Sequence, residues 1–593
     1  GRSSCLPRCW PCSRCRCCRG KVNGQDTALR RRCSCCCPLS RCCAPVVRPA
    51  GRPKPPRLLS SKDGGFSIEV RAVAGDLWYV EGNSPDHTVA DLKERLVAKD
   101  ARFCQNRADL ALDSKILGDA ETLGGCKVRS GSRLACVFSD LKAAVLIIGG
   151  GVAGRTAIKE LSGVFKDQPI ILIDPQEFSE HACGIARAYA DPVAWEALIV
   201  RHEDWLANFS NVQFVQGEVI RLRPGSATVL SSRDGAEFNI RFEYCVVTTG
   251  CSFAPVNPAG ESLWKPTSGD AARRSTRWST LDERTIGGRR RRIMAEHRRI
   301  WEAHDSKGAV LIVGADYQGV EWACELRQNF PQLRIILIDH LPRCLATLPL
   351  AAAEYAEQYM QANGICTCYS LSYEPDNPDF WERCGLQGPA DVTYVLRGVS
   401  ARNGFMPSGT VSSHGPGGGG WIVTNLHLQV CVRRTGDRPI HLWAGGRVFA
   451  AGDCHYGAVV GSGPGGDSSP ESMAEKFIVP PVPKTAHAAV SWARAACRNI
   501  AALHNHYPME NISWPSESGI IAVSLGTKDG VVVWKVKWTR DSGEVVLFGA
   551  PAAEMKKRLT WPDDRNFLAD PTSWLPTLQM HMPTMRLLSE RGR

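Results

Sequence analysis

The sequence predicts an α/β fold built on two separate parallel sheets. Two segments, 141–174 and 309–339, each combine an all-apolar strand, a glycine turn, a helix and a second apolar strand. All-apolar strands are typical of parallel strands that are covered on both faces. In both segments an aspartate ends the second strand, 25 residues after the first glycine of the turn. The repeat therefore indicates two similar units within one chain.

The composition separates a basic head from a nearly neutral remainder. The chain has 593 residues and a formal net charge of +12. Residues 1–60 contain 14 Lys and Arg and a single acid, Asp26, so they carry +13 and leave the remainder at −1. A nearly neutral remainder gives nucleic-acid binding little electrostatic support, so no nucleic-acid partner is predicted. No apolar run reaches the ~18 to 20 residues that cross a bilayer, so no transmembrane span is predicted.

Cysteine is concentrated in the same head. Twelve of the 26 cysteines lie between Cys5 and Cys43. Cys9, Cys12 and Cys15 follow a C-x2-C-x2-C spacing that could hold zinc or an iron–sulfur cluster. A biased low-complexity arm explains the same residues more simply, so no metal site is predicted. The lack of acids and the Arg and Ser content also leave a transit peptide or palmitoylation open.

After the head and linker, residues 1–64, the range 65–139 predicts a small α+β module. Two alternating strands precede a helix whose Val89, Leu92 and Leu96 share one face. The segment "LALDSKILGDAETLGG" and the strand "RLACVF" follow. This order resembles ubiquitin, and the resemblance implies a β-grasp fold. Because no Gly-Gly tail follows, it implies a fixed docking module for a protein partner; a small domain without a partner is the alternative.

The first of the two repeated units carries the motif G-x-G-x-x-G at Gly149, Gly151 and Gly154. The first glycine makes a tight turn, the second lets the backbone approach a pyrophosphate, and the third lets helix and strand pack closely. The helix then points its free N–H groups and the positive end of its dipole at the phosphates. Asp174 ends the next strand, where an acid reaches a ribose 2′-OH. A Rossmann-like unit without a ligand is the alternative.

Two later strand ends add to this pattern. The strand in "EYCVVTTG" ends at Thr249 and Gly250, and the strand in "GRVFAAGD" ends at Gly452 and Asp453. With the first glycine turn, these stretches resemble the two-dinucleotide-domain flavoproteins of the pyridine nucleotide–disulfide oxidoreductase superfamily. The resemblance implies that the first turn holds the ADP part of FAD and that the Thr-Thr-Gly end lies where two domains join. It also implies that Asp453 accepts a hydrogen bond from a ribityl hydroxyl.

The same resemblance implies the domain organisation. An FAD domain is expected over 141–257 and 396–506, split by an inserted NAD(P)H-binding domain over 288–395. A C-terminal region, 507–593, completes the chain. The predicted fold is therefore a pair of Rossmann-like dinucleotide-binding domains preceded by an α+β ubiquitin-like β-grasp domain.

The stretch after the first unit argues against disulfide reductase chemistry. It holds one cysteine, Cys183, whereas thiol–disulfide exchange needs one thiol to attack and another to resolve. Cys183 is therefore predicted to be a small packing residue.

Three stretches resemble one branch of the superfamily: "HACGIARAYADP", "IMAEHRRIWEAHDSKGAVLIVGADYQGVEWACEL" and "SLGTKDGVVVW". They are similar to the apoptosis-inducing-factor-like group and, within it, to the ferroptosis-suppressor-type quinone reductases. Arg187 matches that group's flavin-side arginine. Two Gly/Pro/Ser-rich loops, 256–287 and 457–483, depart from the group because they are longer than expected.

The second unit repeats the first with one exception. Gly314 and Gly319 occupy the outer glycine positions, and Asp339 follows Gly314 by 25 residues. An acid at this strand end favours NADH, because it would repel a 2′-phosphate. Asp316 stands where the second glycine belongs, and its charge would oppose a phosphate about 4 Å away by ~1 to ~4 kcal/mol. We expect a roughly tenfold to thousandfold loss of affinity, unless the turn widens and Asp316 points outward.

Two side chains are the predicted catalytic residues. Glu321 matches the family's glutamate near the nicotinamide and the flavin ring, and the resemblance implies that it orients the nicotinamide carboxamide. The alternative is a first-turn acid that only complements the helix dipole. Lys484, in "PKTAH", matches a lysine near the flavin in the ferroptosis-suppressor-type proteins, where a cation would stabilise negative charge on the reduced ring. The alternative is a solvated loop lysine.

The predicted function is a flavoprotein oxidoreductase that passes electrons from NAD(P)H, preferably NADH, through FAD to a quinone or a similar diffusible acceptor. The cofactor supplies the chemistry, and the protein supplies position and electrostatics. The alternative is an FAD-binding redox sensor or scaffold with weak nicotinamide binding, whose ubiquitin-like module recruits partners. The scattered cysteines outside the head favour a cytoplasmic location, with peripheral membrane association and organelle targeting left open.

Overall fold

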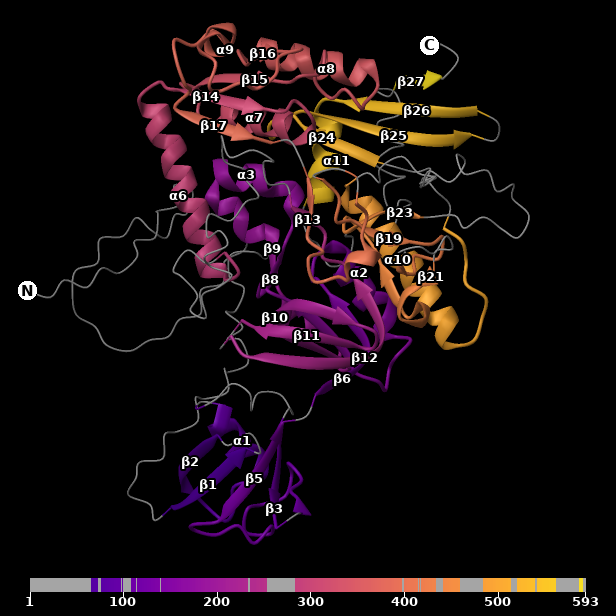
Figure 1. The fold of residues 1–593 in the computed structure, drawn as a ribbon. Coiled ribbons are helices and arrows are strands. Elements are labelled where there is room, and N and C mark those ends of the chain that lie inside the picture. The colour runs from indigo at the N-terminus through magenta and orange to yellow at the C-terminus, as the bar shows by residue number, and fades with distance from the viewer. Residues whose placement is uncertain are drawn as a thin grey trace, which may run out of the picture. The chain divides into compact units, whose positions relative to one another are not determined.

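A computed structural model of the chain describes residues 65–252 and 283–589 apart from internal segments (Figure 1). The omitted internal segments are 73–75, 98, 100–107, 114, 139, 233–234, 397–398, 414, 416–417, 433–440, 459–483, 513–519, 539–540 and 561–585. The predicted head, residues 1–64, and most of the two long loops lie outside the described residues. Within the described ranges, every helix is too short or too polar to span a bilayer.

Residues 66–138 form a mixed five-stranded sheet with one helix. Its elements are β1 (Phe66–Ala72), β2 (Leu77–Asn83), α1 (Val89–Val97), β3 (Ala108–Leu112), β4 (Lys115–Ile116) and β5 (Arg133–Phe138). The strand order is β2-β1-β5-β3-β4, with β1 parallel to β5 and the other pairs antiparallel. The apolar face of α1 is buried as the sequence predicts, with Leu92 and Leu96 in one core with Ile68 and Val70.

The first parallel layer is a six-stranded sheet in the order β11-β10-β7-β6-β12-β22. Its strands are β6 (Leu141–Ile148), β7 (Ile170–Asp174), β10 (Val212–Arg223), β11 (Ser226–Ser231), β12 (Glu237–Val247) and β22 (Val448–Ala450). All neighbours are parallel except β11, which is antiparallel to both β10 and β12. In the sequence, β22 comes after all strands of the second sheet, so the chain returns from the second sheet to add the last strand of the first.

Helices cover the first sheet on one side and irregular segments cover the other. Helices α2 (Val152–Ser162) and α10 (Ala486–His504) share a core with Val145 of β6. The next residue, Leu146, points into a separate core with Trp443. Burial on both faces explains why the strand sequence is apolar throughout.

The second parallel layer has the strand order β16-β15-β14-β17. Its strands are β14 (Ala309–Val313), β15 (Arg334–Ile338), β16 (Cys366–Cys368) and β17 (Val392–Val395), and its helices are α6 (Ile286–Asp305), α7 (Tyr317–Asn329), α8 (Leu350–Ala362) and α9 (Pro378–Arg383). Every residue of β14 is buried. Val310 and Ile312 share a core with α7, whereas Leu311 and Val313 pack with Phe380 of α9.

An antiparallel sheet in the order β24-β25-β26-β27 follows in the C-terminal region. Its elements are β24 (Ile520–Ser524), β25 (Gly530–Trp538), β26 (Asp541–Phe548), α11 (Ala550–Thr560) and β27 (Arg586–Ser589). Val523 and Val531 share a core with Leu326 of α7. Gln328 exchanges two hydrogen bonds with Thr527, at 2.6 and 2.7 Å. The C-terminal sheet is thus attached to the second nucleotide unit by apolar and polar contacts.

Short elements connect the layers. Those after β7 are β8 (Phe178–Glu180), η3 (Ala182–Gly184), α3 (Ile185–Ala190), η4 (Pro192–Leu198), β9 (Ile199–Arg201) and α4 (His202–Leu206). Those around the crossings between sheets are β13 (Cys251–Ser252), β18 (Ser400–Ala401), η5 (Ser408–Thr410), β19 (Ile422–Thr424), β20 (Cys431–Val432), β21 (His441–Leu442), η7 (Trp443–Gly446) and β23 (His455–Ala458). β13 pairs with β18, so the outgoing and returning chains lie side by side.

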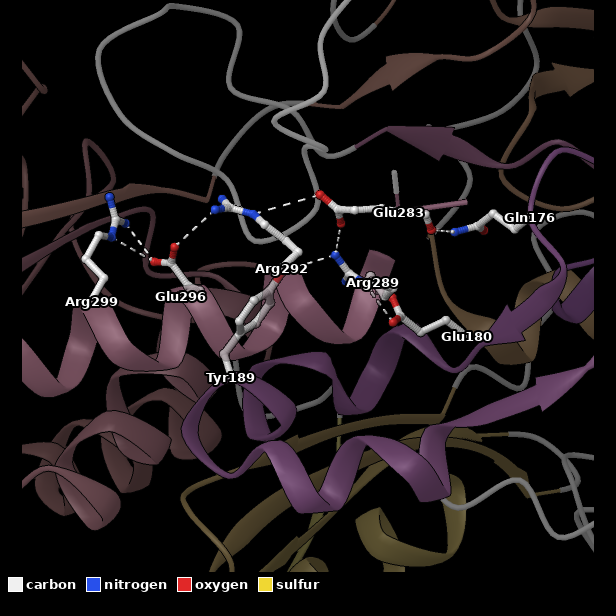
Figure 2. A network of polar contacts seen from close by, with 8 residues as sticks. All are labelled: Gln176, Glu180, Tyr189, Glu283, Arg289, Arg292, Glu296 and Arg299. Carbon is white, nitrogen blue, oxygen red and sulfur yellow. Dashed lines mark hydrogen bonds and ion pairs between the residues drawn. The ribbon is translucent and has the colours of Figure 1, made fainter. Parts of the chain in front are cut away.

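A buried charge network ties α6 to the segment after β7 (Figure 2). Arg289 donates hydrogen bonds to both carboxylate oxygens of Glu180 at 2.9 Å. It also donates to Glu283 and to the Tyr189 hydroxyl, which belongs to α3. Removing one partner of such a buried pair typically costs about 3 to 5 kcal/mol. Since α6 leads into β14, this network anchors the start of the second unit.

Candidate active site

The first glycine turn, between β6 and α2, has the geometry of a phosphate cradle. Gly149 has φ +104°, and a Cβ there would lie 2.5 Å from the carbonyl oxygen of Thr248. A Cβ on Gly154 would lie 1.9 Å from the carbonyl oxygen of Gly149. Neither separation is tolerable in a packed interior, so both positions need glycine. Gly151 is the N-cap residue of α2, with φ −71° and open space around its Cβ position, and a helix N-terminus of this kind can receive a phosphate.

Asp174 braces this turn from the end of β7. Its Oδ2 accepts a hydrogen bond from the Gly150 N–H at 2.6 Å, and its Oδ1 accepts one from the Gln176 N–H at 2.7 Å. The sequence assigned Asp174 to a ribose hydroxyl and missed this bracing role. Each carboxylate oxygen can accept a second hydrogen bond, so the ribose contact stays a prediction.

The Thr-Thr-Gly strand end lies against the first turn. The Thr248 hydroxyl donates to the carbonyl oxygen of Gly149 at 2.8 Å. Thr249 hydrogen-bonds through its Oγ1 to the Oδ1 of Asn403 at 3.0 Å, and Asn403 lies on the returning chain. Gly250, with φ +67°, leads directly into β13. These contacts join the outgoing and returning chains beside the phosphate cradle.

The Gly-Asp strand end reaches α2 from β22. Gly452 has φ +79°, and a Cβ there would lie 3.0 Å from the Cβ of Ala153. The Oδ2 of Asp453 lies 3.9 Å from the Cys251 thiol, whereas its Oδ1 is buried and has no hydrogen-bond partner among the described residues. Burial raises the pKa of Asp453 to about 6, although Lys484 acts to lower it. A hydroxyl donor would satisfy the orphaned oxygen, so this position fits the ribityl chain of FAD.

Lys484 supports the Gly-Asp turn through the backbone. Its Nζ donates to the carbonyl oxygens of Asp453 and His455, both at 3.0 Å, and lies 4.3 Å from the centre of the Trp421 ring. Burial lowers the pKa of Lys484 against the opposing effect of Asp453. These contacts exclude a solvated loop lysine. A direct effect of Lys484 on a flavin ring stays a prediction.

The second glycine turn, between β14 and α7, repeats the first. Gly314 has φ +113°, and a Cβ on Gly319 would lie 1.7 Å from the carbonyl oxygen of Gly314. The Oδ2 of Asp339 accepts a hydrogen bond from the Ala315 N–H at 2.6 Å, the same contact and distance as in the first turn. Asp339 is also buried, and through this hydrogen bond it braces its turn as Asp174 braces the first. The contact of Asp339 with an NADH ribose stays a prediction.

Asp316 takes the place of Gly151 without changing the backbone. It precedes α7 with φ −83° and ψ −171°, compared with −71° and −163° at Gly151. The backbone at this one position is therefore nearly the same in the two turns. The side chain is exposed at the helix N-terminus and makes no capping hydrogen bond. Partial loss of solvent raises the pKa of Asp316, and the nearby Asp339 adds to that shift.

A cavity lies between the segment after β7, helix α7 and helix α11. It opens to solvent, and the empty space between its walls is about 540 Å³ when the adjoining open solvent is included. Two predicted site residues, Arg187 of α3 and Glu321 of α7, line it together with Glu325 and Lys556. Cys183 also lines it as an exposed free thiol, so the prediction that Cys183 is a packing residue is wrong.

Glu321 is held by the C-terminal region. Its Oε1 accepts hydrogen bonds from the Lys556 Nζ at 2.6 Å and from the Ser524 N–H at 2.9 Å. Burial alone would lower the pKa of Lys556, but the adjacent Glu321 raises it overall. Glu321 is 7% exposed and does not serve only the helix dipole. Sequence reasoning missed Lys556, although the "SLGTKDG" stretch that contains Ser524 pointed to the right region.

Comparisons with known proteins agree with this architecture. Residues 143–375 match the family described as "Pyridine nucleotide-disulphide oxidoreductase". The sulfide:quinone oxidoreductase of the hyperthermophilic bacterium Aquifex aeolicus is similar in structure, with a TM-score of 0.51, 14% identity, and coverage of 75% of this chain and 97% of that chain. At this identity the likeness shows the fold alone.

Other solved structures are more distant. The NADH:rubredoxin oxidoreductase of Clostridium acetobutylicum has a TM-score of 0.42 and 14% identity, covering 74% of this chain and 100% of that chain. A ferredoxin reductase of Rhodopseudomonas palustris has a TM-score of 0.45 and 14% identity, covering 68% of this chain and 87% of that chain. No curated protein sequence matches the chain.

Proposed function

We propose that this chain, whose residues 143–375 match the pyridine nucleotide-disulphide oxidoreductase family, is a flavoenzyme that passes electrons from NAD(P)H to a quinone or a similar diffusible acceptor. The family comprises FAD- and NAD(P)H-dependent oxidoreductases. The observation that carries the proposal is the pair of matched glycine turns. In both, a Cβ on the third glycine position would lie within 2 Å of a carbonyl oxygen, and a buried aspartate braces the turn at 2.6 Å.

FAD would occupy the first unit. Gly149, Gly151 and Gly154 would leave room for its pyrophosphate at the N-terminus of α2, and the orphaned Oδ1 of Asp453 would accept a hydrogen bond from its ribityl chain. Bound FAD would supply the two-electron chemistry. The contribution of the protein is to hold the cofactor and to fix the charges around it.

NAD(P)H would occupy the second unit. Glu321 is kept in place by Lys556 and the Ser524 N–H, so it is positioned to orient a polar group such as a carboxamide in the cavity. Asp339 at the strand end favours NADH, because a 2′-phosphate would be repelled there. Asp316 would weaken the binding of either cofactor through its charge.

The acceptor is proposed on chemical grounds. Disulfide exchange requires a second thiol, and the sequence around Cys183 supplies none. The resemblance to ferroptosis-suppressor-type reductases favours a quinone, which the chain would reach from a reducing compartment such as the cytoplasm, with peripheral contact to a membrane where the quinone is membrane-bound.

We also propose that residues 66–138 are a ubiquitin-like docking module. The strand order β2-β1-β5-β3-β4, with β1 parallel to β5, is the arrangement that a β-grasp fold requires, and it supports the resemblance in the sequence. The module would bind a protein partner.

A redox sensor or scaffold is the second candidate function, and Asp316 favours it. An exposed carboxylate at the phosphate position would weaken nicotinamide binding, so that FAD served as a structural cofactor.

Steady-state NADH oxidation with a soluble quinone separates the two functions. The enzyme reading predicts turnover above about 1 per second, within the ordinary range for enzymes. Glu321→Gln should lower this turnover, whereas Glu354→Gln, exposed on α8, should leave it unchanged. Bound FAD with near-zero turnover would favour the scaffold instead.

A further inference from the structure

The cavity between α3, α7 and α11 contains two carboxyl groups in contrasting surroundings. Glu321 and Glu325 lie four residues apart on α7, which places both on one face of the helix. Both line the cavity. The Glu321 Oε1 accepts hydrogen bonds from the Lys556 ammonium group at 2.6 Å and from the Ser524 N–H at 2.9 Å. Among the described residues, the Glu325 carboxyl group accepts one hydrogen bond, a long one of 3.4 Å from the Asn329 side-chain amide.

The surroundings of Glu325 favour its protonated form near neutral pH. The residue is 4% exposed. Burial raises the pKa of Glu325 to about 7, with Arg187 opposing the rise and Glu321 and Asp191 adding to it. Other groups near it are Cys324 on α7, Tyr359 on α8 and Lys556 on α11. A carboxyl group that titrates near the working pH can both give up and regain a proton.

The reaction proposed above needs such a group. Reduction of a quinone by NADH consumes one proton from water: NADH, a quinone and H⁺ give NAD⁺ and a quinol. Two electrons leave the nicotinamide as a hydride equivalent, and the quinone gains those electrons and two hydrogens in all. One of these hydrogens must arrive as a proton, and Glu325, which lines the cavity and is itself almost fully buried, is placed to relay it from solvent.

We propose that Glu325 is the proton donor of this cavity. Its protonated carboxyl group gives the proton to the molecule being reduced, and the resulting carboxylate regains a proton from solvent through the open side of the cavity. Glu321, whose carboxyl group is fixed by Lys556 and the Ser524 N–H, orients the nicotinamide, so one glutamate transfers the proton and the other positions the cofactor. The inference rests on the proposed function.

The test compares the full-length wild type with Glu325→Gln, Glu325→Asp and the exposed control Glu354→Gln, using NADH and a soluble quinone. In the wild type, turnover should fall as the pH rises through about 7, because the donor loses its proton. Glu325→Gln should lower turnover about 100-fold at low pH and flatten the profile. Glu325→Asp keeps a carboxyl group and should restore part of the rate, and Glu354→Gln should match the wild type.

A second readout does not depend on turnover. Burial raises the pKa of Glu325 from the ordinary 4.5 to about 7 in the folded protein. Between these two pH values the folded protein keeps a proton on Glu325 that the unfolded chain has lost. The urea midpoint should therefore fall as the pH rises through this window. Glu325→Gln should lose this component, and Glu354→Gln should keep it.

The outcomes separate the two proposals. No turnover in a wild type that contains FAD overturns the proposed function, and this inference falls with it. A wild type that turns over normally while Glu325→Gln keeps the same rate and pH profile overturns the inference alone. An unchanged pH dependence of the urea midpoint in Glu325→Gln also overturns it, because Glu325 would then not hold a proton near neutrality.

Discussion

The two glycine turns share a backbone but differ at one side chain. Gly151 and Asp316 precede their helices with φ values of −71° and −83°. A Cβ on Gly149, Gly154 or Gly319 would collide with neighbouring backbone, whereas the Cβ position of Gly151 faces open space. The fold therefore constrains the outer positions, and only a ligand would sense the middle one. A chain can keep the architecture of a nucleotide site while it changes the affinity of that site.

The largest expected effect is a loss of stability when the third glycine of either turn, Gly154 or Gly319, is replaced. Gly154→Ala and Gly319→Ala would place a Cβ 1.9 and 1.7 Å from a carbonyl oxygen. Overpacking of this kind should cost about 3 kcal/mol or more of unfolding free energy in either unit, as measured by urea denaturation. Gly163→Ala is the matched control, because Gly163 follows α2 with φ −76° and has open space around its Cβ position.

The control should change stability by less than about 1 kcal/mol, since alanine adopts this backbone conformation without strain. Urea midpoints for Gly154→Ala and Gly319→Ala that equal the Gly163→Ala value would show that the close approach in the two turns is not real.

A reciprocal exchange tests what the two turns do not share. Asp316→Gly should tighten NADH binding roughly tenfold to a thousandfold, because it removes about 1 to 4 kcal/mol of repulsion at the phosphate position. Gly151→Asp should weaken FAD retention by a similar factor. Calorimetry for NADH and flavin fluorescence after gel filtration would measure the two effects. Equal NADH affinity in wild type and Asp316→Gly would contradict the assignment of Asp316.

A smaller effect should appear in the pH dependence of cofactor affinity, which should have opposite signs for FAD and NADH. Asp453 would accept a hydrogen bond from FAD as a carboxylate, so FAD affinity should fall as the pH drops below about 6, by up to about tenfold per pH unit. Asp316 opposes phosphates only when it is ionised, and its pKa is raised. NADH affinity should therefore rise on acidification.

Asparagine variants provide the controls for both dependences. Asp453→Asn should flatten the FAD profile alone, and Asp316→Asn should flatten the NADH profile alone. If FAD affinity and NADH affinity changed in the same direction with pH, the Asp453 and Asp316 carboxylates would not be what distinguishes cofactor binding in the two units.

The parts of the site that could be predicted are local in sequence. Gly154 and Gly319 are specified by short-range geometry, because a Cβ there would meet the carbonyl oxygen of the first glycine of the same turn. Gly149 and Gly314 have φ +104° and +113°, a backbone conformation that favours glycine. The apolar strands were recognisable for the same reason, since burial on both faces acts on consecutive residues.

The remaining features depend on contacts between distant segments. Lys556 reaches Glu321 across more than two hundred residues of chain, and no spacing rule links them. Cys183, which the sequence predicts to be packed, is exposed, and the cavity that it lines forms only when α7 and α11 come together with the segment after β7. Asp174 was read from its motif as a ribose ligand, and its hydrogen bond to the Gly150 N–H appears only once the turn is folded.

The absorbance spectrum of the purified protein, before and after anaerobic addition of NADH, tests the central claim most directly. If both units bind their cofactors, the purified protein should show flavin absorbance bands and NADH should bleach them. The wild type should need a higher NADH concentration for bleaching than Asp316→Gly. A protein without flavin bands would contradict the assignment of the first unit. Bands that saturating NADH leaves unchanged, in both the wild type and Asp316→Gly, would contradict that of the second.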